Sequence, residues 1–384
     1  MPSVIADVLL VTPNSLVRPV CIETDNEGRI RQIHEGHDPP AGSDVVFDGA
    51  GDLYVTAGFI DIHTHGANGF DLSDATLEAV ETMAKAKLAE GVTTFLPTTW
   101  TASPEHTLEM AKAAAAYREK QQYARTPFLH VEGPYLNPDQ AGAQDPRFMR
   151  PPDLAEIEEL DSICPVGLLS LAIEREGAIP LIRELSRRGI VTSAAHSAAT
   201  YAQFVQAREA GLGHLTHYCN QMSHLHHREV GLVGGGLLDD QVMIELICDG
   251  IHLSREMIQL AFKHRSLERL MLITDSMAAS HLGEGTYPLH DGEIVVKDGA
   301  ARIPAGNLAG SIITFDAALR NAVEFTGLSL NDIIRTAGAN QARSLGLRDR
   351  GEIKQGLLAD LTLLSPGLEV VAVYVGGDQR FSAE

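Results

Sequence analysis

The hydrophobic residues of this chain fall into short continuous runs, and from residue 54 onward each run is followed by an amphipathic stretch. Short apolar runs bounded by glycine or polar turn residues are typical of strands that are buried on both faces. Such runs predict eight strands, at residues 58–63, 92–97, 127–132, 166–173, 190–196, 212–217, 242–248 and 270–275. A segment of alternating pattern between residues 283 and 306 predicts a hairpin inserted after the last of these strands.

The amphipathic stretches between the runs carry residues that favour helix ends. Residues 74–90 begin near Ser73 and Asp74, which are typical of a helix N-terminus, and stop at Gly91, which is typical of a C-terminus. Helical patterns also cover residues 104–121, 177–188, 314–326 and 330–346. Repeated β-then-α units predict an α/β fold, a closed (β/α)8 TIM-like barrel, with an open doubly wound sheet as the alternative.

The two ends of the chain have a different pattern. Residues 6–11 and 17–22 are short strand-like runs broken by proline, asparagine and glycine, and the C-terminal tail returns to strand character. We therefore expect residues 1–53 and 355–384 to form one small β-sandwich domain beside a barrel of residues 54–354.

The charge of the chain disfavours some classes of partner. With 30 Lys and Arg against 51 Asp and Glu, the formal net charge is −21, which argues against nucleic acid and anionic membranes. The N-terminus lacks the basic segment and long apolar core of a signal peptide, and no apolar run reaches the length of a transmembrane helix. The four cysteines are scattered, so neither a disulfide framework nor a cysteine metal site is indicated. We expect a cytoplasmic protein.

Residues with metal-ligand chemistry end several of the predicted strands. In a barrel of this kind the working groups lie at the carboxyl ends of the strands. His63 and His65 are two residues apart at the end of the first strand, so both imidazoles face one side. The remaining strand-end residues of this kind are Glu132, His196, His217 and Asp275. Imidazole and carboxylate groups together predict a metal site at this rim.

The chemistry that such a set supports is metal-assisted hydrolysis. A bound zinc or similar ion lowers the pKa of water toward neutrality and polarises a carbonyl group. Asp275 is suited to take the water proton and later to deliver it to a leaving nitrogen. The alternative for Asp275 is a further structural ligand or a helix cap.

The strand-end residues belong to longer motifs that resemble one known family. From about residue 55 to residue 364 the chain is similar to the amidohydrolase superfamily and, within it, to the N-acetylglucosamine-6-phosphate deacetylases. The motifs that carry the resemblance are Ala57–Gly66, Gly91–Thr99, His130–Tyr135, Ala195–Thr200, Leu225–Glu229, Asp249–His252, Ile273–Asp275 and Leu308–Ser311. The segments Thr98–Ala102 and Leu225–Glu229 also resemble N-acetylgalactosamine-6-phosphate deacetylases.

The resemblance implies a role for each strand-end residue. Glu132, His196 and His217 are expected to hold the principal metal, with Asp275 as general base and acid. Because the chain keeps both histidines of the first strand, a second metal bridged by Glu132 is compatible with the family. The expected cofactor is a divalent metal, first of all Zn²⁺, at one or two ions per chain.

The resemblance further implies that the substrate phosphate is bound by Arg228 and His252, supplied by the neighbouring subunit, which predicts a functional homodimer. A fixed guanidinium fork suits phosphate oxygens, and Arg228 is a rare basic group in an acidic chain. The alternative for Arg228 is a salt bridge to the adjacent Glu229.

Three residues are expected at the substrate. Asn220 and Gln221 fall where the family's loop holds the sugar and phosphate, although Gln221 is larger than the alanine or glycine common there. Gln144 replaces a family histidine that approaches the reacting amide. These departures leave the identity of the sugar open.

Together these observations predict a metal-dependent hydrolase that deacetylates an N-acetyl amino sugar 6-phosphate of the gluco or galacto series. The alternatives are a superfamily hydrolase acting on an N-acyl amino acid or an unphosphorylated sugar, and a non-catalytic barrel that serves as a scaffold. Two-metal hydrolases of cyclic amides generally carry a modified lysine at the end of strand four. Residues 167–174, which form the fourth predicted strand, contain no lysine, and this argues against a cyclic amide as the substrate.

Overall fold

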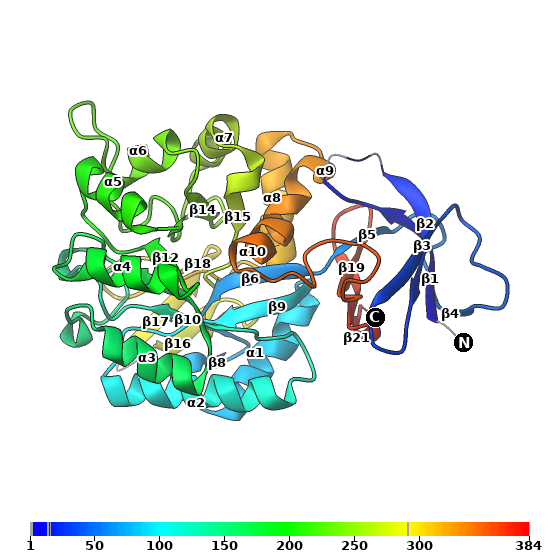
Figure 1. Cartoon of the computed structure of the whole chain (residues 1–384), viewed down its shortest axis with the longest axis horizontal. Coiled ribbons are helices and arrows are strands. Elements are labelled where there is room, and N and C mark those ends of the chain that lie inside the picture. The colour runs from blue at the N-terminus through cyan, green and yellow to red at the C-terminus, as the bar shows by residue number, and fades with distance from the viewer. Residues whose placement is uncertain (1–2, 14, 16, 290–291, 384) are drawn as a thin grey trace.

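The computed structural model describes residues 3–13, 15, 17–289 and 292–383, and it consists of a β/α barrel beside a smaller β-domain (Figure 1). Across these residues, no helix combines the length and the apolar character needed to cross a membrane.

Eight strands form the barrel wall and match the eight predicted runs. They are β6 (Phe59–Thr64), β9 (Val92–Pro97), β10 (Leu129–Glu132), β11 (Val166–Leu171), β12 (Val191–Ala194), β13 (His214–Leu215), β14 (Met243–Leu246) and β15 (Leu270–Leu272). β10 to β15 form one parallel sheet, and β6 pairs in parallel with β9. Isolated bridges from Thr98 to His130 and from Thr64 to Ser276 join the two groups, so the barrel closes. The predicted fold class is confirmed over the open doubly wound sheet.

A helix follows each strand of the wall along the chain. These helices are α1 (Leu77–Ala89), α2 (Pro104–Lys120), α3 (Leu154–Ile163), α4 (Ala178–Arg187), α5 (Tyr201–Ala210), α6 (Gly231–Leu238), α7 (Arg255–His264) and α8 (Phe315–Thr326). The chain then passes through α9 (Leu330–Ile333) and α10 (Ala339–Ser344). Short 3₁₀ turns are η1 (Leu72–Asp74), η2 (Pro138–Gln140), η3 (Pro146–Phe148), η4 (Leu267–Arg269) and η5 (Ile334–Ala337).

Two helix predictions need correction. The stretch 330–346 is not one helix, because Gly338 leaves the helical conformation, with φ −168° and ψ −54°, between η5 and α10. The first helix begins later than predicted, because the Thr76 side chain accepts the hydrogen bond from the Ala79 backbone and caps it. Asp74 belongs instead to the separate turn η1.

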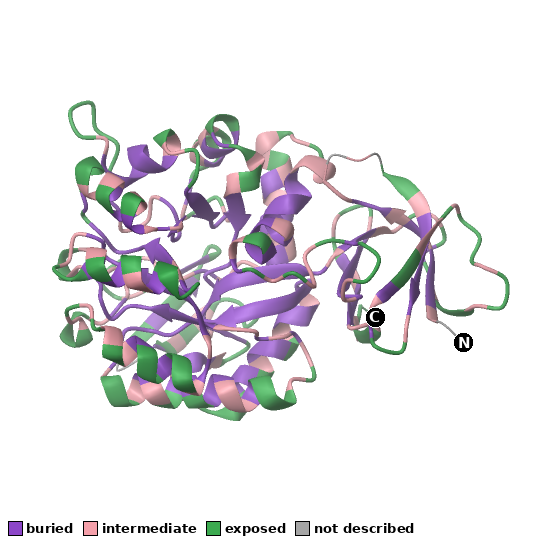
Figure 2. Cartoon of the chain, in the orientation of Figure 1, coloured by how far each residue is buried: buried purple, intermediate pink, exposed green. Residues whose placement is uncertain are grey.

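Burial explains why the wall strands are continuous apolar runs. Every residue of β6, β9 and β11 is buried, since each strand faces the barrel interior on one side and helices on the other (Figure 2). Inside the barrel, Ile60, Leu168 and Met271 pack together. The polar residues at the strand ends therefore lie above an apolar floor.

The predicted insert is present and has three strands rather than two. β16 (Gly285–Leu289), β17 (Gly292–Lys297) and β18 (Ala300–Arg302) form an antiparallel sheet. Its buried face, including Ile294 and Val296, packs against Trp100 and Met277. This contact holds the insert beside the carboxyl ends of the barrel strands.

Both ends of the chain build the second sheet, as expected for the small β-domain. Its strands are β1 (Ser3–Leu10), β2 (Arg18–Thr24), β3 (Ile30–Glu35), β4 (Asp44–Asp48), β5 (Tyr54–Ala57), β19 (Leu361–Leu364), β20 (Val370–Val375) and β21 (Asp378–Ser382). β5 lies in the middle and pairs with β1 on one side and β19 on the other. A two-stranded pair, β7 (Gly66–Ala67) and β8 (Phe70–Asp71), leads from β6 toward α1.

Candidate active site

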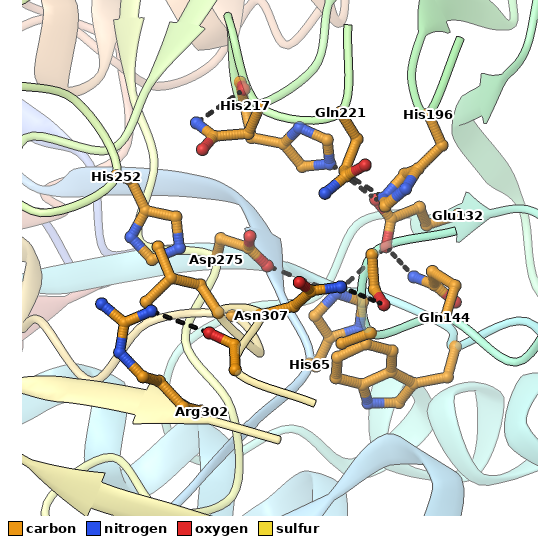
Figure 3. Close-up of a pocket in the computed structure, with 17 residues that line it drawn as sticks. His65, Glu132, Gln144, His196, His217, Gln221, His252, Asp275, Arg302 and Asn307 are labelled. Carbon is orange, nitrogen blue, oxygen red and sulfur yellow. Dashed lines mark hydrogen bonds and ion pairs between the residues drawn. The ribbon is translucent and has the colours of Figure 1, made fainter. Parts of the chain in front are cut away.

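A pocket of about 310 Å³ lies at the carboxyl ends of the barrel strands (Figure 3). The residues predicted from the sequence that line it are His65, Glu132, Gln144, His196, His217, Asn220, Gln221, His252 and Asp275. His63 lies beside them and is fully buried. The barrel topology thus brings together residues that are far apart along the chain.

One group of possible metal ligands is Glu132, His196 and His217. Glu132 ends β10, and its Oε1 atom lies 3.1 Å from His217 Nε2 and 3.4 Å from His196 Nε2. One ligand atom from each of the three side chains lies within 4.8 Å of the others. Two imidazoles and a carboxylate at this spacing can hold a divalent cation.

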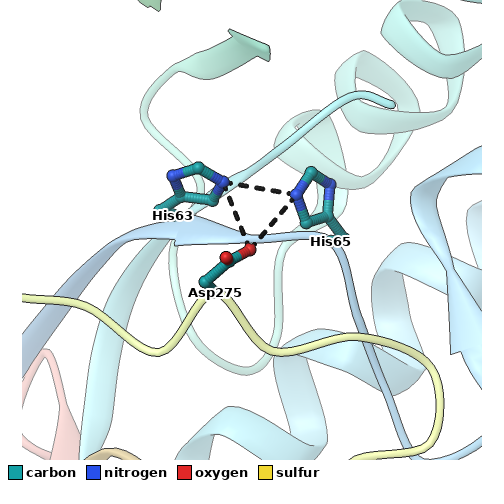
Figure 4. A group of neighbouring side chains, drawn as sticks. All are labelled: His63, His65 and Asp275. Carbon is teal, nitrogen blue, oxygen red and sulfur yellow. Dashed lines mark hydrogen bonds and ion pairs between the residues drawn. The ribbon is translucent and has the colours of Figure 1, made fainter. Parts of the chain in front are cut away.

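A second group consists of His63, His65 and Asp275 (Figure 4). The two histidine Nε2 atoms are 3.2 Å apart, and each lies 3.4 Å from Asp275 Oδ1. The other oxygen of Glu132, Oε2, lies 3.2 Å from His65 Nε2 and 3.6 Å from His63 Nε2. Glu132 therefore faces both groups, one oxygen toward each.

The hydrogen bonds of the imidazole rings show that these ligand atoms are arranged for a cation. His65 Nδ1 lies 3.1 Å from the Thr98 carbonyl oxygen, and His196 Nδ1 lies 2.7 Å from that of Gln140. Because a carbonyl oxygen only accepts, each neutral ring carries its proton on Nδ1 and directs its Nε2 lone pair toward Glu132. Lone pairs and carboxylate oxygens that converge in this way repel one another unless a proton or a metal ion lies between them.

The shifted pKa values of the histidines and Glu132 also show that the site favours positive charge. Burial lowers the pKa of His65, but its hydrogen bonds to Asp275 and Glu132 outweigh burial and raise the pKa to about 9. Burial likewise opposes charge on His63, yet the negative charges of Asp275 and Glu132 hold its pKa well above the usual value. Burial raises the pKa of Glu132, but the positive charge of His63 and the histidine hydrogen bonds hold it well below its usual range. A divalent cation here would replace protons on the histidines.

The far side of His63 faces a buried carboxylate that the sequence analysis did not identify. Glu245, in β14, places Oε2 3.9 Å from His63 Nδ1 and Oε1 2.9 Å from His214 Nδ1. Burial raises the pKa of Glu245, but its interactions with His214 and His63 lower it to about 2, so it is ionised. A carboxylate behind a metal-ligand histidine favours the tautomer that leaves Nε2 free for the metal.

A buried ion cluster joins α1 to the strands that carry His63 and Asp275. Lys87 Nζ lies 3.1 Å from Asp61 Oδ2 and 3.0 Å from Glu90 Oε2, and it donates to Thr274 Oγ1 at 3.1 Å and Ser276 Oγ at 2.9 Å. All three charged side chains are fully buried. Because Asp61 lies in β6 and Thr274 and Ser276 flank Asp275, this cluster fixes the two chain segments relative to each other.

Gln144 makes a contact that the sequence analysis did not anticipate. It lines the pocket, but its Nε2 also donates to Glu132 Oε2 at 2.5 Å, and its Oε1 accepts from the Thr101 backbone at 2.7 Å. The side chain is therefore held against a carboxylate of the candidate metal group, and it also borders the space for a substrate.

The two residues expected to bind phosphate lie in different places. His252 follows β14 and lines the pocket of its own chain, so the expectation that a neighbouring subunit supplies it is wrong. It lies between the end of β14 and the start of α7, on the side of the barrel where the pocket opens. Arg228 is exposed, contacts His227 at 2.6 Å, and is not among the described residues that line this pocket. Arg228 therefore does not reach the site of its own chain.

Among the pocket residues that were not predicted from the sequence, three have side chains with polar nitrogen atoms: Trp100, Arg302 and Asn307. The Trp100 ring stacks on His65 at 3.9 Å, and its Nε1 donates to Asp71 Oδ2 at 2.9 Å. Its position three residues after the end of the predicted strand 92–97 was an available signal. Arg302 and Asn307 belong to the insert, whose placement over the strand ends follows from tertiary packing.

Comparison with known proteins agrees with the fold. The amidohydrolase family profile matches residues 54–380. The N-acetylgalactosamine-6-phosphate deacetylase of Escherichia coli O157:H7 is 37% identical over 324 residues, which cover 83% of this chain and 85% of that protein. The N-acetylglucosamine-6-phosphate deacetylase of Bacillus subtilis (strain 168) is 33% identical, and the match covers 98% of this chain and 96% of that protein.

Among solved structures, a mutant N-acetyl-D-glucosamine-6-phosphate deacetylase from Mycobacterium smegmatis, in complex with N-acetyl-D-glucosamine-6-phosphate, superposes with a TM-score of 0.92 at 32% identity. The match covers 99% of this chain and 100% of that chain. Because both the family profile and these relatives span most of its length, the chain belongs to the amidohydrolase family and, within it, to the family of the N-acetylglucosamine-6-phosphate deacetylases.

Proposed function

We propose that this protein hydrolyses the acetamide of an N-acetyl amino sugar 6-phosphate, N-acetylglucosamine-6-phosphate or N-acetylgalactosamine-6-phosphate, to acetate and the amino sugar phosphate. The observation that carries the proposal is the meeting of two ligand groups at Glu132, with Asp275 beside them in one pocket. The relatives that act on these two sugars support this substrate class.

The cofactor in this proposal is Zn²⁺, at one or two ions per chain, because imidazole and carboxylate ligands suit zinc. Glu132, His196 and His217 would hold one ion, and His63 and His65 a second. When bound, such an ion lowers the pKa of water and polarises the acetamide carbonyl.

Asp275 supplies the proton transfers. Burial raises the pKa of Asp275, but the positive charges of His63 and His65 and a hydrogen bond from His65 lower it, so the carboxylate is ionised and can accept a proton from water. The oxygen of the deprotonated water bonds to the acetamide carbonyl carbon. Asp275 then delivers the proton to the amide nitrogen as the C–N bond breaks, which gives acetate and the amine of the sugar. Gln144, Asn220 and Gln221 offer hydrogen-bonding groups to orient the substrate.

The proposed assembly is a homodimer in which Arg228 of the partner subunit reaches the substrate phosphate. Arg228 is exposed on the short turn between His226 and Glu229, where a second subunit can pack. In this chain the alternative salt bridge is not formed, since Glu229 Oε1 accepts backbone hydrogens from Tyr201 and Gly231.

Acetate release from a panel of substrates tests this function. The panel contains N-acetylated glucosamine, galactosamine and amino acids, the sugars with and without the 6-phosphate. The proposal expects turnover of at least one phosphorylated sugar, at a kcat/KM well above that of its unphosphorylated form. Preference for an N-acetyl amino acid would favour the other amidohydrolase reaction and contradict the sugar assignment.

A further inference from the structure

We infer that Arg302 is a phosphate ligand supplied by the same chain as the metal-ligand groups, acting together with His252. This inference rests on the proposed function, because it assigns a binding site to the substrate's 6-phosphate. Arg302 ends β18, the last strand of the insert, and lines the pocket with His252. In Figure 3 both side chains lie on one side of Asp275, and Glu132 and Gln144 lie on the other.

Arg302 is a cation without a carboxylate partner among the described residues. Its Nη1 atom donates to the Gly306 carbonyl at 2.9 Å, and no ion pair between described residues includes it. This contact with a carbonyl does not neutralise the charge of the guanidinium. Arg302 is exposed at the pocket, and in a chain of net charge −21 a guanidinium without a carboxylate partner among the described residues is suited to an anionic ligand.

His252 presents a second donor from a fixed ring. Its side chain is 6% exposed, and its Nδ1 atom lies 2.6 Å from Asp249 Oδ2. Because a carboxylate accepts, Nδ1 carries the proton of this bond, and Nε2 donates to a phosphate oxygen when it carries a proton as well. Asp249 is itself held by backbone hydrogen bonds from Ile251 and His252, both at 2.8 Å. The ring therefore has one orientation.

The two ends of the pocket match the two ends of the proposed substrate. An amino sugar 6-phosphate carries its acetamide on C2 and its phosphate on C6, on opposite sides of the sugar ring. The metal-ligand groups and Asp275 would face the acetamide, and Arg302 and His252 would face the phosphate. Arg228 of the partner subunit would complete this site, and Arg302 adds a second guanidinium from the same chain as the metal-ligand groups.

Two measurements test the inference, and each uses the metal-loaded protein. In the first, Arg302→Gln is compared with wild type in acetate release. We expect the KM for the phosphorylated sugar to rise at least about tenfold more than the KM for the unphosphorylated sugar, as lost charge-assisted hydrogen bonds imply. Arg302→Lys, which keeps the charge but loses the planar fork, should recover part of this loss. Arg187→Gln, on the exposed end of α4, is the matched control.

The second measurement is independent of turnover. Trp100 is the only tryptophan and lines the pocket, so its fluorescence reports titration with inorganic phosphate. We expect wild type to bind phosphate at least about tenfold more tightly than Arg302→Gln. Equal KM changes for both sugars, or equal phosphate binding by both proteins, would overturn the role of Arg302. Absence of deacetylation together with phosphate binding lost in Arg302→Gln would instead refute the proposed function and leave the anion site standing.

Discussion

At the scale of single residues, the site is built on unusual backbone conformations. His196, His217 and Asp275 all have positive φ angles, of 45°, 30° and 50°. Residues other than glycine rarely adopt this region, which costs on the order of 1 kcal/mol at each position. The surrounding structure holds Asp275 there, since its backbone N–H donates to His63 at 2.9 Å and its carbonyl accepts from Ser311 at 2.7 Å. The backbone conformation thus fixes where these three side chains start.

The proton-transfer role of Asp275 is tested by Asp275→Asn. The amide has the same shape but cannot take up a proton as the carboxylate does, so we expect kcat to fall about 10²- to 10⁴-fold. Metal content and the thermal unfolding temperature should stay close to wild type. Acetate release and elemental analysis measure these quantities, and a rate near that of wild type would exclude Asp275 as the general base.

The pKa of His65 predicts how metal binding depends on pH. A group with a pKa of about 9 in the metal-free protein holds its proton at lower pH, and a metal must displace that proton. The apparent affinity should therefore weaken as pH falls, about tenfold per pH unit for each proton released. Competition with a zinc-binding dye between pH 6 and pH 8 measures this slope (buffers that do not chelate metals are required). A flat profile would show that the metal does not replace this proton.

At the scale of secondary-structure elements, helix α1 contributes more than an outer cover to the barrel. Its Lys87 compensates two buried carboxylates, Asp61 and Glu90, and Glu90 Oε1 also lies 2.9 Å from His281 Nε2. Burial opposes charge on Lys87, but Glu90 and Asp61 outweigh burial and raise its pKa, so the ammonium group stays protonated. The cluster therefore links α1, β6 and the end of β15 through charge.

Replacing this charge should destabilise the fold. We expect Lys87→Met to lower the free energy of unfolding by about 3–5 kcal/mol, because it removes the ammonium group that pairs with two buried carboxylates. Lys85→Met, at an exposed position of the same helix, is the matched control and should change stability by less than about 0.5 kcal/mol. Urea unfolding measures both. Equal stability of the two variants would mean that Lys87 does not compensate the carboxylates.

The elements also show how far the sequence could predict the site. The wall strands were recognisable because burial on both faces requires continuous apolar runs, and their ends placed Glu132 and Asp275 at one rim. Glu245 gave a signal that was missed, since it is the only charged residue in the apolar run 242–248. The position of Arg302 could not be predicted, because it depends on how the insert packs against Trp100 and Met277 rather than on local pattern.

At the scale of the whole molecule, the proposed dimer makes a distinctive prediction. If Arg228 of the partner subunit completes each site, Arg228→Ala and Asp275→Asn impair different parts of the same site. In a mixed dimer, the Arg228→Ala chain keeps Asp275 and the Asp275→Asn chain supplies Arg228. One of the two sites therefore contains both residues. We expect co-refolded mixtures to regain activity that neither variant has alone.

Acetate release with the phosphorylated sugar measures this complementation, and sedimentation confirms that mixed dimers form. A mixture of Arg228→Ala with Arg228→Ala carrying Asp275→Asn is the control, since no chain in it retains Arg228. Lack of any gain in the first mixture would argue against shared sites.

The division of the chain at residues 53/54 and 354/355 also stays a prediction, and limited proteolysis of the whole protein can test it.

The central place of β5 in the smaller sheet has a consequence for biosynthesis. β5 pairs with β19, so Ala57 lies opposite Leu361, and nearly the whole barrel is translated between these two partners. Until the last strands leave the ribosome, β5 exposes an open sheet edge, and such edges invite pairing with other chains. The nascent protein therefore depends on β19 to cover the edge of β5. Loss of the last strands should cause aggregation during synthesis, even though the metal-ligand residues are all translated earlier.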